Sequence, residues 1–339
     1  MIPAGTLQSI ILKIGGEGPE RTARSERGIA AGYNAFCMSQ RSVFRNRAEY
    51  AIAVAVVKSL EWAPLPVAHG LARCYVRLLD VAIPRLRRVA LRNLSFAMPE
   101  LDDARRAAIA GGVFRSIARI LVAFARFPSI HRGNLDGWIR AEGAEHFQAA
   151  ISRGRGVLFA TAHLGNWELS AFAHGLLTGP MHVVARPLDN PLIDRLVERR
   201  RALSGNRPLF KKDFARAILK ALAANQAVGV LIDQNSSLGT GVFADFFGVP
   251  ACAGTGFAKI AWRSGAAVIP GFALWMEGER RYVLRFYPPV EMTGDAARDT
   301  RELQRRLEAV VREYPDQWLW IHRRWKTRPP GSPPLYDSL

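Results

Sequence analysis

The sequence predicts an α/β protein in which a mostly parallel central sheet is flanked by helices and preceded by a helical N-terminal region. Three observations predict this architecture. Short apolar runs alternate with helical stretches from residue 155 onward, which is typical of βαβ units. Apolar residues recur at helical spacing between residues 45 and 130. The chain has 339 residues, 49% of them hydrophobic, so it can bury a substantial core.

Four parts follow one another along the chain. Residues 1–44 show neither periodicity nor a signal-peptide pattern, and we expect a disordered extension there. Residues 45–135 form the helical region, residues 136–329 the α/β core and residues 330–339 a tail.

The helical region is predicted to associate with a membrane surface. Its apolar run Tyr50–Val57 lies between Glu49 and Lys58 and is far short of the ~18–20 residues that span a bilayer. Residues 62–79 are largely apolar but contain prolines and arginines, which favours a helix lying in the interface. Residues 99–103 then predict a turn and an N-terminal cap for a further amphipathic helix.

The formal net charge is +18, which implies attraction to an anionic partner such as a nucleic acid, a bilayer surface or an acidic protein. Within the helical region, arginines are interleaved with large apolar residues, as in helices that lie on membranes. These arginines are Arg73, Arg77, Arg85, Arg87, Arg88, Arg92, Arg105, Arg106, Arg115, Arg119 and Arg126. Solvated helix faces on a basic protein explain any single one of them equally well.

Four apolar runs predict the strands of the core. They are Val157–Ala162, His182–Ala185, Val228–Ile232 and Ala266–Ile269, with helices predicted over residues 191–201 and 214–223. A polar residue follows each of the first three: His163, Arg186 and Asp233. Because the carboxyl ends of parallel strands share one edge of the sheet, we expect these three side chains to converge.

The segment His163–Glu168 carries the strongest chemical signal. Asn166 is positioned to cap a helix that starts near Trp167, which places the imidazole and the carboxylate close to a helix N-terminus. A histidine accepts a proton near neutral pH, and a carboxylate fixes its tautomer and stabilises the imidazolium. The alternative interpretation is a structural histidine beside an unrelated surface glutamate.

The C-terminal part predicts an amphipathic helix containing Leu303, Leu307 and Val310, followed by the aromatic and basic segment Trp318–Lys326. Such a segment can stack on nucleic-acid bases, lie at a membrane interface, or pack on the core through its tryptophans.

Several catalytic motifs are missing from the sequence. It contains no GxSxG, HExxH, Walker A or strand-following GxGxxG motif, and its three cysteines form no CxxC pair, which fits a reducing compartment. Without a protein nucleophile, the histidine–carboxylate pair suits direct attack of a substrate hydroxyl on an activated electrophile such as a thioester. Arg186 or the helix N-terminus would then stabilise the oxyanion.

An ordered set of short strings resembles the bacterial lipid A biosynthesis (lauroyl/myristoyl) acyltransferases, within the lysophospholipid acyltransferase superfamily. The strings are Arg92–Leu94 with Pro99–Glu100, Ala162–Glu168, Ala185–Asn190, Leu231–Asn235, Phe243–Gly248 and Trp318–Lys326. They span roughly residues 45–329.

The resemblance implies transfer of an acyl chain from acyl carrier protein to a hydroxyl of a lipid A precursor or related glycolipid, without a covalent acyl-enzyme. His163 and Glu168 match the family's His-x4-acid catalytic motif, with Glu168 orienting the base, and Arg186, Asp233, Gln234 and Asn166 are expected to bind or position substrate. It also implies location at the cytoplasmic face of the bacterial inner membrane, peripherally or through one N-terminal anchor. No metal, cofactor or nucleic-acid partner is implied.

Three alternatives remain open. Related branches acylate other phospho- or glycolipids, and some use coenzyme A donors. A basic nucleic-acid-binding protein would show tight, salt-dependent binding to RNA or DNA. A metal-dependent hydrolase would use His163, Glu168 and Asp233 as ligands.

Overall fold

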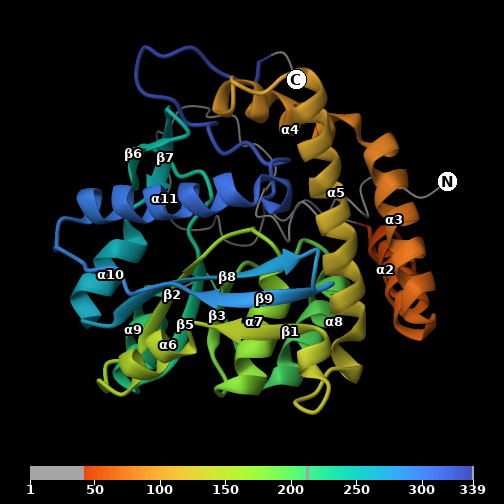
Figure 1. Ribbon diagram of the computed structural model, residues 1–339, viewed down its shortest axis with the longest axis horizontal. Helices are drawn as coiled ribbons and strands as arrows, with labels where there is room; N and C mark the ends of the chain where they lie inside the picture. Colours follow the sequence, from red (N-terminus) through yellow and green to blue (C-terminus); the bar gives the residue numbers. More distant parts are fainter. Residues whose placement is uncertain (1–41, 211–213, 338–339) are drawn as a thin grey trace.

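The computed structural model describes residues 42–210 and 214–337 and has a central sheet with helices on both faces (Figure 1). The predicted α/β class with a mostly parallel sheet is confirmed. The predicted extension over residues 1–44 lies almost entirely outside the described residues, and the first described helix already begins at Val43.

Seven strands form the central sheet in the order β1-β9-β8-β2-β5-β3-β4. Their bounds are β1 (Ile139–Glu142), β2 (Val157–Thr161), β3 (His182–Ala185), β4 (Arg207–Phe210), β5 (Ala227–Leu231), β8 (Ala267–Met276) and β9 (Arg281–Phe286). Strands β8, β2, β5, β3 and β4 run parallel, whereas β9 is antiparallel to β8 and parallel to β1. A separate antiparallel hairpin consists of β6 (Gly241–Phe246) and β7 (Val249–Gly254).

The helices form two layers because successive side chains of a strand point to opposite faces of the sheet. On one face, Phe159 of β2 packs with α6 (Ala144–Ile151), α7 (Trp167–Leu177) and α8 (Pro191–Arg201). On the other face, Leu158 and Ala160 pack with α9 (Phe214–Ala223), α10 (Gly256–Ser264) and α11 (Ala296–Glu313).

All four predicted strands exist, but β8 is longer than its apolar run suggests. It continues through Pro270 to Met276. Pro270 lies where pairing with β2 ends, at Ala160, and where pairing with β9 begins, at Gly271. A proline has no N–H to donate, and this change of partner is a position where a strand tolerates the missing donor.

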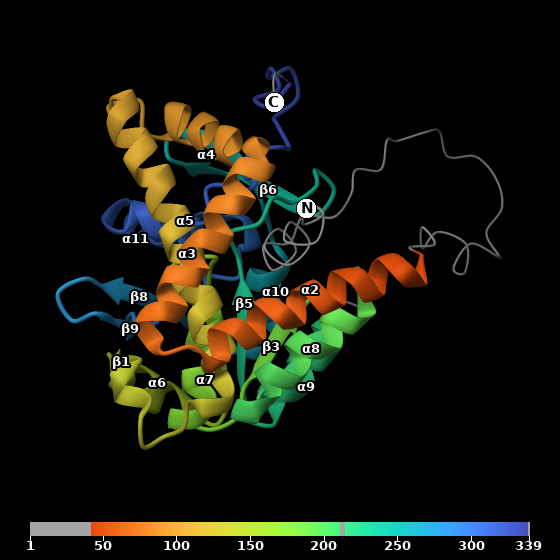
Figure 2. The same cartoon turned by 90° about the vertical axis from the view of Figure 1, so that its right-hand side faces the viewer.

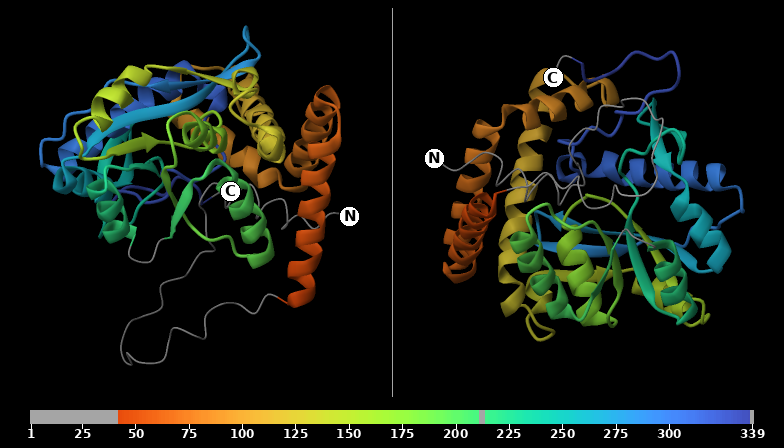
Figure 3. Two further views of the ribbon diagram at one scale, coloured as in Figure 1. Left: turned by 90° about the horizontal axis from the view of Figure 1, so that it is seen from below. Right: turned by 180° about the vertical axis from the view of Figure 1, so that it is seen from behind.

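Four helices confirm the predicted helical region: α2 (Val43–Trp62), α3 (Leu65–Ala82), α4 (Pro84–Ala97) and α5 (Asp103–Arg126). Asp102 caps α5 by accepting a hydrogen bond from the Arg105 N–H. Helix α2 packs against α3, α5 and α8 along one side of the molecule (Figures 2 and 3). Within the described residues, only Asp103–Ser129 is long and apolar enough to cross a membrane, and 67% of its apolar window is buried. A buried core helix can be equally long and apolar, so this property does not by itself indicate a membrane span.

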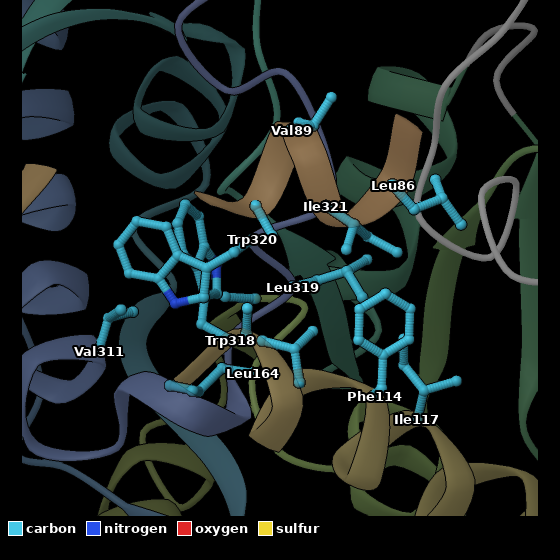
Figure 4. Packing of buried hydrophobic residues seen from close by; sticks show 14 of the residues in the cluster. Leu86, Val89, Phe114, Ile117, Leu164, Val311, Trp318, Leu319, Trp320 and Ile321 are labelled. Atoms are coloured by element: carbon cyan, nitrogen blue, oxygen red, sulfur yellow. The ribbon is translucent and has the colours of Figure 1, made fainter. Parts of the chain in front are cut away.

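The aromatic C-terminal segment belongs to the core. Trp318, Trp320 and Trp325 are fully buried, and Trp318 and Trp320 lie beside α5 and Leu164 (Figure 4). Of the three interpretations of this segment, packing on the core is therefore confirmed, and the buried rings are not placed to stack on bases or to reach a membrane interface.

Candidate functional site

The predicted convergence at the carboxyl edge of the sheet brings His163 and Asp233 into contact. His163 follows β2 and Asp233 follows β5, and these two strands are neighbours. The His163 Nδ1 lies 3.0 Å from Asp233 Oδ1, and the His163 backbone N–H donates to Oδ2 at 2.9 Å. One carboxylate thus holds both the ring and the backbone of the histidine.

Asp233 is completely buried and ionised. Burial by itself raises the pKa of this carboxyl, but the facing His163 imidazole and its hydrogen bonds hold the pKa well below the usual range. The indole N–H of Trp318 also donates to Oδ2, at 3.0 Å. The sequence assigned Asp233 to substrate binding and the orienting role to Glu168. In the structure, however, the His163 Nδ1 pairs with Asp233. The pairing of β2 with β5 brings these two residues together although they are 70 positions apart in the chain.

Glu168 has a different partner. Its carboxylate accepts two hydrogen bonds from the Arg201 guanidinium, at 2.8 and 2.5 Å, and only 6% of the residue is exposed. The bidentate pair joins the first turn of α7 to the end of α8. Sequence reasoning missed Arg201, which lies in the run Glu198–Arg201 at the end of a predicted amphipathic helix and has no signal that separates it from its neighbours.

Asn166 caps α7, as the sequence predicts. Its Oδ1 accepts from the Leu169 N–H at 3.0 Å, and the residue is fully buried. This placement argues for a structural role in fixing the helix start, and the predicted contact with substrate gains no support from it.

A cavity of about 520 Å³ lies between the sheet and helices α7 and α8. That volume is within the usual range for small-molecule sites. Most of the lining is apolar and includes Phe127, Phe159, Phe172, Met181, Leu284 and Phe286. Polar and charged residues line it as well, among them Glu168, Arg186, Arg201 and Gln234. Arg186 and Gln234 therefore share one cavity, while the His163 ring packs edge-on against the lining residue Trp167, with 5.0 Å between ring centroids.

The histidine that lines the cavity is His174, whereas His163 and Asp233 are not among the lining residues. His174 lies among Phe147, Phe159 and Phe286 and is 3% exposed. Burial lowers its pKa to about 4, so the ring is neutral. Thr178 Oγ1 lies 2.9 Å from the His174 carbonyl, to which it donates, and 3.0 Å from the His174 Nε2.

The residues suggested as metal ligands do not form one cluster. Glu168 pairs with Arg201, apart from the His163–Asp233 contact. Within residues 42–210 and 214–337, no group of three His, Cys, Asp or Glu side chains is arranged to hold a metal ion.

Comparison with known proteins identifies the family of the chain. The model of the family described as bacterial lipid A biosynthesis acyltransferase matches residues 39–327. The chain is 29% identical to the lipid A biosynthesis lauroyltransferase of Escherichia coli, over 80% of this chain and 90% of the relative. It is also 29% identical to the palmitoleoyltransferase of the same organism, over 81% of this chain and 90% of that protein. A phosphatidylinositol mannoside acyltransferase of Mycolicibacterium smegmatis is 30% identical, over 66% and 73% of the two chains. The chain therefore belongs to the bacterial lipid A biosynthesis acyltransferase family and is an enzyme that transfers acyl groups to lipid A or a glycolipid.

Proposed function

We propose that this enzyme transfers a fatty acyl chain from the thioester of acyl carrier protein to a hydroxyl of a lipid A precursor or related glycolipid. The observation that carries the proposal is the His163–Asp233 pair at the carboxyl edge of the sheet, next to a largely apolar cavity. Coenzyme A thioesters are the alternative donor. The names of the relatives support the lipid acceptor class.

In this proposal His163 is the general base. Asp233 accepts a hydrogen bond from Nδ1–H, which fixes the tautomer in which Nε2 carries the lone pair. Nε2 takes the proton of the acceptor hydroxyl as its oxygen attacks the thioester carbon. The nearby ionised Asp233 stabilises the imidazolium that forms.

The tetrahedral intermediate then collapses without a covalent enzyme intermediate. The C–S bond breaks, and the leaving thiolate takes the proton from Nε2, so the products are an ester and a free thiol. Arg186, one of the arginines that line the cavity, would stabilise the oxyanion.

The apolar part of the cavity would hold the acyl chain. Glu168 would contact the acceptor, and this role is supported by its position in the cavity lining and by its pairing with Arg201. We therefore replace the predicted orienting role of Glu168 by a role in positioning the acceptor.

The membrane surface would be approached through α2 and α3. Exposed apolar side chains are concentrated there, including Trp62, Leu65, Val67, Leu78 and Val81. Arg73 and Arg77 are exposed on the same helix, α3. An apolar stripe beside cations suits an anionic bilayer, in keeping with the proposed location at the cytoplasmic face of the inner membrane. Acyl carrier protein, being acidic, would also be attracted by the net charge of +18.

The test compares His163→Ala and Asp233→Asn with the unaltered enzyme, using acyl carrier protein thioester and lipid A precursor. Removal of a general base typically costs 10²–10⁴-fold in rate, so we expect kcat of His163→Ala to fall by about that factor. Asp233→Asn should also lose most activity, because the tautomer is no longer fixed. Circular dichroism checks that both variants fold. Ordinary transfer rates in folded His163→Ala would rule out the proposed base.

A further inference from the structure

We propose that α2 is a positioning element for the candidate site and acts through α8. The inference rests on the proposed function, because it requires that Glu168 serve the reaction. Helix α8 ends at Arg201, which holds the Glu168 carboxylate. Side chains of α2 hold α8 at both of its ends.

At the start of α8, Asn190 makes two kinds of contact. Its Oδ1 accepts the Leu192 N–H at 3.0 Å and caps the helix. Its Nδ2 donates to Glu49 Oε2 and to the Asn46 carbonyl of α2, each at 3.0 Å. Asn190 and Glu49 are almost completely buried. One amide side chain therefore both starts α8 and ties it to α2.

At the other end of α8, Arg200 makes the contact with α2 and α5. Its Nη2 donates to Glu61 Oε2 of α2 at 2.5 Å, and its Nη1 donates to the Ala125 carbonyl of α5 at 2.7 Å. The Arg200 side chain is only 7% exposed. A charge this deeply buried requires its partner, so the pair fixes the lateral position of α8 strongly.

Arg200 and Arg201 are neighbours that point in different directions, because successive residues of an α-helix are about 100° apart. Arg200 faces α2 and α5, whereas Arg201 faces the cavity and Glu168. Any shift of α8 relative to α2 therefore moves the guanidinium that fixes Glu168. A displacement of about 1 Å in an active site can cost about 10²-fold in rate.

The experiment is a double-mutant cycle in the full chain. The variants are Glu61→Gln, Glu168→Gln and the two combined, assayed for kcat/KM toward the lipid acceptor. We expect Glu61→Gln to lower kcat/KM about 10-fold in the unaltered background, and less than twofold once Glu168 is already replaced. Residues that act as a unit are non-additive in this way. A merely structural contribution would lower activity by the same factor in both backgrounds.

Lys58→Gln is the matched control. Lys58 also pairs with Glu61, at 2.9 Å, but its side chain is exposed, so its loss leaves the Arg200 contact in place and should leave activity unchanged. If Glu61→Gln does not fold, Asn190→Ser replaces it, because serine keeps the cap and removes the Nδ2 donor.

The outcomes separate the two proposals. Equal effects of Glu61→Gln in both backgrounds, or an effect of Lys58→Gln as large as that of Glu61→Gln, would overturn the positioning role of α2. If Glu168→Gln alone keeps full activity, the proposed role of Glu168 fails, and with it the basis for this inference.

Discussion

Asp233 shows how a buried charge is kept in this protein. Its two oxygens accept from the His163 ring, the His163 backbone and the Trp318 indole, so both oxygens of the carboxylate have donors. A buried carboxylate without such donors would take up a proton instead. The same contacts that keep Asp233 ionised therefore also hold the imidazole in place.

His174 provides a prediction for pH-dependent stability. Its pKa of about 4 in the folded protein lies below the ordinary value of 6.5. Between these values the unfolded chain binds a proton that the folded protein does not, so stability is full above pH 6.5 and falls as the pH approaches 4. The difference between these two pKa values corresponds to about 3 kcal/mol in the free energy of unfolding. Denaturant unfolding from pH 7 to 4.5 should show a smaller loss for His174→Phe than for the unaltered protein.

The exposed His131 supplies the control, since His131→Gln should follow the unaltered protein over this pH range. An undiminished loss of stability in His174→Phe would show that other groups cause it.

Single residues also mark the limit of sequence reasoning. His163 and the cap Asn166 could be predicted because both follow from local order: a strand, a turn and a helix start. The contacts of Asp233 and Glu168 could not be predicted, because each depends on a partner that is distant in the chain. Asp233 meets His163 through strand pairing, and Glu168 meets Arg201 through the packing of α7 against α8.

At the scale of elements, strands β2, β3, β5 and β8 were predictable because each carries a continuous apolar run. Strands β1, β4, β6, β7 and β9 were missed. In β9, Arg281 and Arg285 interrupt the apolar run with cations that pair with Glu279 and Glu142. Such pairs form only after folding, so the periodicity of the sequence does not reveal them.

Strand β5 shapes the cavity through a glycine. Gly229 lines it, and a Cβ at this position would lie 2.8 Å from the Met181 methyl group. We therefore expect Gly229→Val to displace the flexible Met181 side chain into the cavity and shorten the space for an acyl chain. Mass spectrometry of the transferred chains, with a mixture of donors from eight to sixteen carbons, should show a shift toward shorter chains.

Gly137→Ala is the control for this substitution, since Gly137 lies outside the cavity lining and its Cβ would meet nothing within 4 Å. An unchanged chain-length distribution in folded Gly229→Val would mean that the acyl chain lies elsewhere.

The whole molecule has two very different sides. Helix α3, with its exposed apolar stripe of Val67, Leu78 and Val81, lies at the opposite end from α10 (Figures 1 and 3). Both helices carry exposed cations, Arg73 and Arg77 on α3 and residues 259 and 263 on α10. The net charge therefore does not distinguish the two ends, and the proposal that the α3 side meets a bilayer rests on the exposed apolar stripe.

We predict that the α3 side alone supports binding to anionic vesicles. Each cation near such a surface contributes about 1 kcal/mol, so replacing Arg73 and Arg77 by Gln should weaken binding roughly 30-fold and reduce its dependence on salt. Val81→Ser should weaken binding at every salt concentration, because it removes apolar contact without adding a charge. Vesicle co-sedimentation measures both effects. Replacing Lys259 and Arg263 of α10 by Gln removes the same charge from the far end and should change binding little; an equal loss there would mean that net charge, and no particular face, holds the enzyme on the membrane.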